Sequence, residues 1–133
     1  MLGKQVGDLS GKITGQRVLE SDGGPKVESS FKAAGKLAGV DASMMGTYLA
    51  VARPDGMLHG RGQGVIMTTD GGMGSWTGEG LGKFTRKGGV SYRGAIFIYS
   101  THQKLGRLNN VATVFEWEID AQDNAQGKLF EWK

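Results

Sequence analysis

The chain has 133 residues, of which 38% are hydrophobic and 22% are charged, and this length and balance predict one globular domain over residues 1–133. It contains no cysteine, which excludes disulfides, thiolate metal ligands and a cysteine nucleophile. The net charge of +3 comes from lysines and arginines that alternate with acids along the whole chain, so we expect no nucleic-acid partner.

From Gly11 onward, apolar and polar residues alternate with a period of two, which is the pattern of half-buried β-strands. Clusters of Gly, Asp and Asn separate the alternating stretches, as expected of hairpin turns. The clearest alternation lies in 27–39, where Phe31 and Leu37 share one face and Lys32 and Lys36 share the other. The predicted strands span 12–20, 27–39, 44–53, 57–69, 75–85, 90–100, 111–120 and 128–132.

The segment 101–109 interrupts this pattern. Ser100 or Thr101 can cap a helix there, and leucines at 105 and 108 are spaced for a single helical turn. We therefore predict one short helical turn that acts as a plug or a connector.

The 24 glycines exceed twice the average frequency of about 7%. Two triplets have the period of a strand, Gly60-x-Gly62-x-Gly64 and Gly78-x-Gly80-x-Gly82. Glycine within a strand is expected where a sheet bends sharply or where a bulky cross-strand neighbour needs room. These observations favour an all-β fold, a single antiparallel up-and-down β-barrel of about eight strands, with a β-sandwich as the alternative.

No complete catalytic, metal or nucleotide motif is present. Neither glycine triplet matches G-x-G-x-x-G, because Val65 and Lys83 stand where the pattern would continue, so we expect no cofactor. His59 and His102 are far apart in the sequence and have no metal-ligand spacing. We interpret His59 as a surface or rim residue and His102 as structural, and we predict no metal site.

Glu79 is the first candidate for a catalytic acid or base. If Lys87-Gly88 is a two-residue hairpin loop, Glu79 lies across from Ile96 and shares a face with Leu81, Tyr92 and Ile98. A carboxylate facing a barrel lumen would be desolvated, which would raise its pKa. The alternative is that Glu79 is paired and exposed at a strand edge.

A ligand cavity is the second hypothesis, because aromatic residues fall on the predicted strands. We assign ligand binding to Tyr92, Ile96, Ile98 and Trp117, although aromatic side chains in a small barrel also serve simply to fill the core. The opposite face of the hairpin over 75–100 is also partly apolar, which is expected where a second subunit covers the outside of a barrel, so we predict a homo-oligomer.

Four further segments stand out, 69–78 (TDGGMGSWTG), 91–95 (SYRGA), 104–111 (KLGRLNNV) and 114–116 (VFE). With these segments the sequence resembles a small bacterial family of uncharacterised proteins with an allene oxide cyclase-like barrel. The similarity covers most of the chain from about residue 27. It implies a closed barrel and no assigned activity. Allene oxide cyclases isomerise a fatty-acid epoxide and the related dirigent proteins steer a coupling reaction, but no catalytic residue of either is matched here.

Three functions follow as hypotheses. The first is a barrel that binds a small apolar ligand without transforming it. The second is an isomerase or cyclase resembling allene oxide cyclase with Glu79 as the acid or base, and the third is a structural or interaction module with a filled barrel. The first ten residues contain no signal-peptide core and no stretch is apolar enough for a membrane helix, so we expect a cytoplasmic protein without membrane association.

Overall fold

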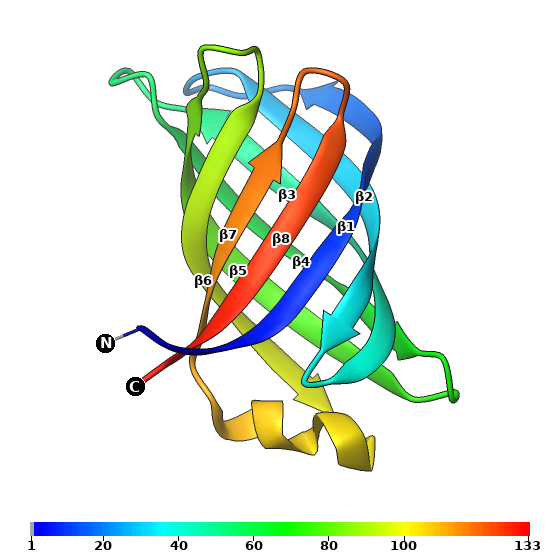
Figure 1. Ribbon diagram of the computed structural model, residues 1–133. Coiled ribbons are helices and arrows are strands. Elements are labelled where there is room, and N and C mark those ends of the chain that lie inside the picture. Colours follow the sequence, from blue (N-terminus) through cyan, green and yellow to red (C-terminus); the bar gives the residue numbers. More distant parts are fainter. Residues whose placement is uncertain (1) are drawn as a thin grey trace.

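Alternating residues form eight antiparallel strands that close into a barrel in the computed structural model, which describes residues 2–133 (Figure 1). Each strand pairs with the next one along the chain, and β8 pairs with β1. The predicted all-β up-and-down barrel of about eight strands is therefore confirmed. The strands are β1 (Leu2–Leu19), β2 (Lys26–Leu37), β3 (Val40–Ala52), β4 (Leu58–Thr68), β5 (Met73–Phe84), β6 (Val90–Ser100), β7 (Thr113–Ile119) and β8 (Asn124–Trp132).

The largest difference from the predicted strands lies in β1, which begins ten residues earlier than the alternation indicates. Its pairing with β8 shifts register between Leu2 and Gln5 and again between Gln5 and Gly7. Such bulges place consecutive residues on the same side, and Val6 and Gly7 are both buried. Because the period of two fails there, the sequence pattern did not reveal this half of the strand.

Four hairpins have the same turn geometry. In each, a residue with positive φ donates a backbone hydrogen bond to the carbonyl oxygen of the residue three positions earlier. This is the geometry of a type I turn followed by a left-handed residue. In three of the four hairpins the left-handed residue is glycine, which adopts this conformation without steric cost. The positions and their φ angles are Gly56 (84°), Gly71 (93°), Gly88 (88°) and Asp123 (65°).

The turn at Gly88 corrects the predicted register of β5 and β6. The hairpin is closed by Phe84 opposite Val90, so its loop is longer than the two residues expected. The shift of one residue places Tyr92 opposite Gly82, and Glu79 opposite Ala95 instead of Ile96. Because side chains alternate across a strand, this single residue turns the side of β5 that carries Glu79 and Leu81 outward. Tyr92, Ile96 and Ile98 of β6 lie on the inner face, as predicted.

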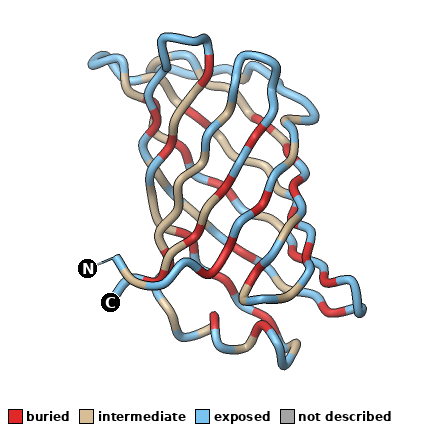
Figure 2. The backbone as a smooth tube through the Cα atoms, in the orientation of Figure 1, coloured by how far each residue is buried: buried red, intermediate tan, exposed pale blue. Residues whose placement is uncertain are grey.

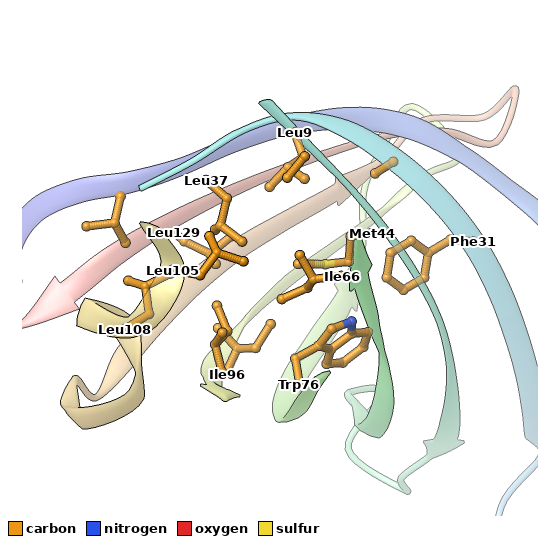
Figure 3. Close-up of a cluster of buried hydrophobic side chains, with 14 residues drawn as sticks. Leu9, Phe31, Leu37, Met44, Ile66, Trp76, Ile96, Leu105, Leu108 and Leu129 are labelled. Atoms are coloured by element: carbon orange, nitrogen blue, oxygen red, sulfur yellow. The ribbon is translucent and has the colours of Figure 1, made fainter. Parts of the chain in front are cut away.

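Buried positions occur on every strand (Figure 2). They form one hydrophobic core that extends from Phe31 and Trp76 to the helix η1 (Gln103–Asn110) (Figure 3). This 3₁₀ helix lies across the end of the barrel that also holds both chain termini (Figure 1). Its Leu105 and Leu108 are fully buried in the same cluster as Leu37 and Leu129. The helical turn predicted at 101–109 is thus present, and it plugs the barrel. Within residues 2–133 no helix is long and apolar enough to cross a membrane.

Polar contacts hold η1 against the strands. Arg107 forms an ion pair with Glu131, whose side chain is only 8% exposed. The amide of Asn109 exchanges two hydrogen bonds with the backbone of Ser100, of 2.8 and 2.9 Å. Buried polar groups require such partners, so the plug closes this end without leaving the Glu131 carboxylate unpaired.

Candidate functional site

The half of the lumen away from η1 is lined on one side by bare backbone. Gly60 and Gly62 of β4 pair with Gly80 and Gly78 of β5, and all four face inward. We call these four residues the glycine wall. Because they have no side chains, neighbouring strands can place large rings in the lumen. A Cβ atom at Gly60 would lie 3.2 Å from Tyr92 Cε1, and one at Gly80 would lie 3.0 Å from Phe115 Cζ.

Aromatic rings from β2, β3, β5, β6 and β7 meet beside this wall. The ring of Phe31 lies 4.7 Å from that of Trp117, 5.8 Å from that of Trp76 and 6.2 Å from that of Tyr48, measured between centroids. The rings of Tyr48 and Tyr92 meet edge to face at 5.7 Å. These are the tilted arrangements that aromatic pairs favour. Phe31, Tyr48, Trp76, Tyr92 and Trp117 therefore form one continuous group of rings, which we call the aromatic cluster.

A cavity of about 80 Å³ remains between the aromatic cluster and the glycine wall. A single buried water requires about 10–15 Å³, so the cavity can hold a small group of heavy atoms. All eight strands contribute to its lining. The inward-facing residues around it are Leu9, Phe31, Ala33, Met44, Tyr48, Gly60, Gly62, Trp76, Gly78, Gly80, Tyr92, Ile96, Phe115, Trp117, Gly127 and Leu129.

Few polar atoms accompany these apolar side chains. The indole nitrogen of Trp117 donates a hydrogen bond of 3.4 Å to the hydroxyl of Tyr48. The hydroxyl of Tyr92 makes no hydrogen bond with residues 2–133, although the residue is only 5% exposed. Burial raises the pKa of both tyrosines, so both hydroxyls stay protonated at neutral pH.

The indole nitrogen of Trp76 is also buried without a hydrogen-bond partner among the described residues. It lies against Gly64, where an added Cβ would come within 2.4 Å of it. Leaving a buried donor unpaired costs about 1–3 kcal/mol. The packing of the ring against Gly46 and Gly64 offsets this cost, and it explains why the interior positions of β3 and β4 carry glycine there.

Of the four residues that we assigned to ligand binding, three line the cavity. Tyr92, Ile96 and Trp117 belong to its wall, whereas Ile98 packs in the hydrophobic core towards η1. The assignment missed Tyr48, whose hydroxyl contacts Trp117, and it missed the glycine wall as a lining surface. The sequence did contain a signal for the glycine wall, namely two glycine triplets on adjacent predicted strands. When such strands pair, neither has side chains on the shared face, and this leaves space there.

Glu79 does not face the lumen, so its predicted position is wrong. Its side chain is 52% exposed on the outer surface, where its carboxylate lies 2.6 Å from His59 Nε2 and 3.7 Å from Arg61 Nη2. The hydrogen bond with His59 and the charge of Arg61 hold the pKa of Glu79 below its usual range, instead of raising it. The alternative, a paired and exposed carboxylate, describes the residue. The cause is the longer hairpin loop at Gly88.

Other charged side chains also have partners outside the lumen. Glu118 accepts a hydrogen bond of 2.6 Å from Arg93 on the outer surface, and Glu116 lies 3.9 Å from the same guanidinium group. His102 caps η1 through a hydrogen bond from Lys104 N and is structural, as we expected. No group of three or more His, Asp or Glu side chains within residues 2–133 is arranged to hold a metal ion.

Known structures show the same barrel. No protein-family model matches the chain, and no curated protein is similar to it in sequence. A conserved protein of unknown function from Rhodopseudomonas palustris superposes with a TM-score of 0.84 at 16% identity, over 98% of this chain and 97% of that one. A β-barrel-like protein from Acinetobacter baumannii gives 0.79 at 12% identity, over 100% and 96%. An enzyme from Penicillium herquei gives 0.62 at 16%, over 96% of both chains.

At these identities the comparisons define the class of fold. The chain has the closed barrel of uncharacterised bacterial proteins, as its sequence resemblance implied. The further likeness to allene oxide cyclase stays a prediction.

Proposed function

We propose that the barrel binds a small, largely apolar molecule in its lumen. The cavity between the glycine wall and the aromatic cluster carries this proposal. A mostly apolar pocket with a few polar groups is the usual form of a small-molecule site. The plug η1 closes one end of the barrel, so a ligand would enter from the opposite end, where the β1–β2, β3–β4, β5–β6 and β7–β8 hairpin loops lie (Figure 1).

An isomerase or cyclase resembling allene oxide cyclase is the second candidate. The structural neighbour from Penicillium herquei, which is described as an enzyme, favours it. Against it, Glu79 lies outside the barrel and cannot act as the acid or base. The titratable groups among the inward-facing lining residues are the hydroxyls of Tyr48 and Tyr92, and their raised pKa makes both weak acids. Binding without transformation therefore has the stronger support.

The third candidate, a structural module whose barrel is filled by its own side chains, has support only in the half near η1. The cluster of Leu37, Ile66, Leu105 and Leu108 is fully buried there. The other half retains open space beside Tyr92. Natural cores contain few voids larger than a water molecule, so an unfilled cavity of this size favours a ligand site.

Ligand binding can be tested by titrating the protein with toluene while NMR records the chemical shifts of the backbone amides. We expect saturable shifts at the cavity residues Gly78 and Trp117 and none at Phe97 on the outer surface. Ile96→Phe places a larger side chain in the cavity and should weaken binding at least tenfold. Ala95→Ile, the neighbouring outward position, is the matched control and should leave affinity unchanged. Shifts that never saturate, or that appear only on the outer surface, would contradict the proposal.

We also propose that the chain is a homo-oligomer, as the sequence suggested. An outer apolar face covers β3 to β6, and its large side chains are 39–61% exposed. The cross-strand pairs Met45–Val65, Met67–Met73 and Ser75–Tyr99 make it continuous. Soluble monomers rarely leave such a face uncovered. The outer apolar face consists of Met45, Val65, Met67, Met73, Phe97 and Tyr99.

A further inference from the structure

We propose that the lumen site takes a small molecule without any hydrogen-bonding group, such as a short or cyclic hydrocarbon, and rejects the same molecule once it carries a hydroxyl. This inference rests on the proposed ligand-binding function and narrows it to a chemical class. It follows from the polar atoms around the cavity, which are paired with one another or turned away from the open space.

The glycine wall consists of peptide backbone, yet it presents almost no polar atom to the cavity. Gly60 pairs with Gly80, and Gly62 pairs with Gly78, in the antiparallel ladder between β4 and β5. In such a ladder the N–H and C=O groups bond to the neighbouring strands within the sheet. The surface that these glycines turn towards the lumen therefore consists mainly of their Cα methylene groups.

The aromatic residues of the lining likewise contribute their rings and not their polar atoms. The indole nitrogen of Trp117 already donates its hydrogen bond to the Tyr48 hydroxyl. Trp76 Nε1 is the one side-chain nitrogen or oxygen of residues 2–133 that is both buried and unpaired, and it packs against the backbone at Gly64. Tyr92 lines the cavity with its ring, since almost no polar atom faces the open space.

A lining of this kind selects ligands by the polar groups that they lack. A ligand hydroxyl that enters the cavity loses its hydrogen bonds to water and gains none from the protein. The same lining offers no donor to an epoxide oxygen, which a substrate of the allene oxide cyclase kind carries. A hydrocarbon has no such cost, because cavities lined by apolar groups stay dry and bind small apolar molecules.

Toluene and phenol form a matched pair of probes, because a hydroxyl replaces a methyl group at nearly constant size. NMR titration of the full chain measures the affinity of each. We expect toluene to bind at least about 100-fold more tightly than phenol. Transfer of a hydroxyl from water into a solvent without hydrogen-bond partners costs more than this factor, whereas transfer into a solvent that supplies partners costs much less.

A variant that supplies the missing partner tests the cause of this selectivity. Ile96 lines the cavity and is 6% exposed, so Ile96→Thr places a hydroxyl in the lining. The ratio of the two affinities should then fall at least about fivefold. Ile96→Val, which has nearly the shape of threonine without its hydroxyl, is the matched control and should leave the ratio unchanged. Both variants keep a β-branched residue in β6, which suits a strand.

The outcomes distinguish this inference from the function on which it rests. If toluene does not bind saturably, the proposed function itself fails. If toluene binds but its advantage over phenol is smaller than expected, a lumen site remains and the exclusion of polar ligands is overturned. An equal change of the ratio in Ile96→Thr and Ile96→Val would show that the apolar lining is not the cause, and it would overturn the inference as well.

Discussion

Asp123 occupies the position that glycine fills in three equivalent hairpins, with a φ of 65°. The left-handed conformation costs an ordinary L-residue about 1–2 kcal/mol, and glycine avoids this cost but loses about 0.5–1 kcal/mol of backbone entropy on folding. We therefore expect Asp123→Gly to raise the free energy of unfolding by about 0.5 kcal/mol. The opposite kind of change at an equivalent turn, Gly88→Ala, should lower the free energy of unfolding by about 1 kcal/mol. Urea unfolding measures both, and a loss of stability in Asp123→Gly would contradict the argument.

Single residues also set the limit of the sequence analysis. The strand over 90–100 was predicted with its observed bounds and its inner face, yet the faces of its hairpin partner β5 were reversed. The dipeptide Lys87-Gly88 reads equally well as a two-residue loop or as part of a longer turn with a left-handed glycine. Periodicity fixes which residues share a face but not which face is inside. The position of Glu79 relative to the lumen therefore required the structure.

At the scale of elements, Asp70 connects the β4–β5 turn to the plug η1. Its carboxylate lies 3.2 Å from both Lys104 Nζ and His102 Nε2, and the Thr68 hydroxyl donates a hydrogen bond to it. These contacts lower the pKa of Asp70 from 3.8 to about 2. The largest cause is the hydrogen bond from Thr68, the next is the hydrogen bond from Lys104, and the charges of His102 and Lys104 add to them. The ionised form is therefore favoured in the folded protein.

A carboxylate whose pKa is depressed by folding stabilises the protein above its unfolded pKa, and the effect is lost as the pH falls through the folded value. For Asp70 the stabilisation should be complete above pH 3.8 and vanish near pH 2. The stability of Asp70→Asn should therefore converge with that of the wild type as urea unfolding is repeated from pH 5 to pH 2. Lys104→Ala should destabilise the wild type at pH 5 and have no effect in Asp70→Asn. A constant difference across this range would exclude the linkage.

The elements themselves were largely predictable, because hydrophobic alternation reports burial on one face of a sheet. It failed at the bulges of β1 and at Ala38-Gly39, where two left-handed residues form a tight turn that the alternation over 27–39 had included in a strand. The cavity was only partly predictable. Tyr92, Ile96 and Trp117 follow from their strands, but the cavity itself depends on how rings from distant strands pack together.

At the scale of the whole molecule, the outer apolar face has a groove on one side and exposed rings on the other. A shallow groove runs over β1 to β4 and includes Met45, Val65 and Met67. The exposed rings of Phe97 and Tyr99 stand on β6, on the other side of the same face. A two-fold axis parallel to the strands, between β4 and β5, would place the rings of each copy over the groove of the other. An isologous contact of this kind fills both grooves at once, which makes a second copy the natural partner.

Self-association is the prediction that follows, and sedimentation equilibrium measures it. We expect wild-type protein to be dimeric at 100 μM, and Phe97→Asp to be monomeric at the same concentration, because it would bury an unpaired charge in the contact. Phe84→Asp alters an aromatic residue that is 67% exposed at the opposite end of the barrel, so it should remain dimeric. Retained circular dichroism in both variants would show that the barrel is intact. A monomeric wild type, or equal disruption by both changes, would remove the outer apolar face as the interface.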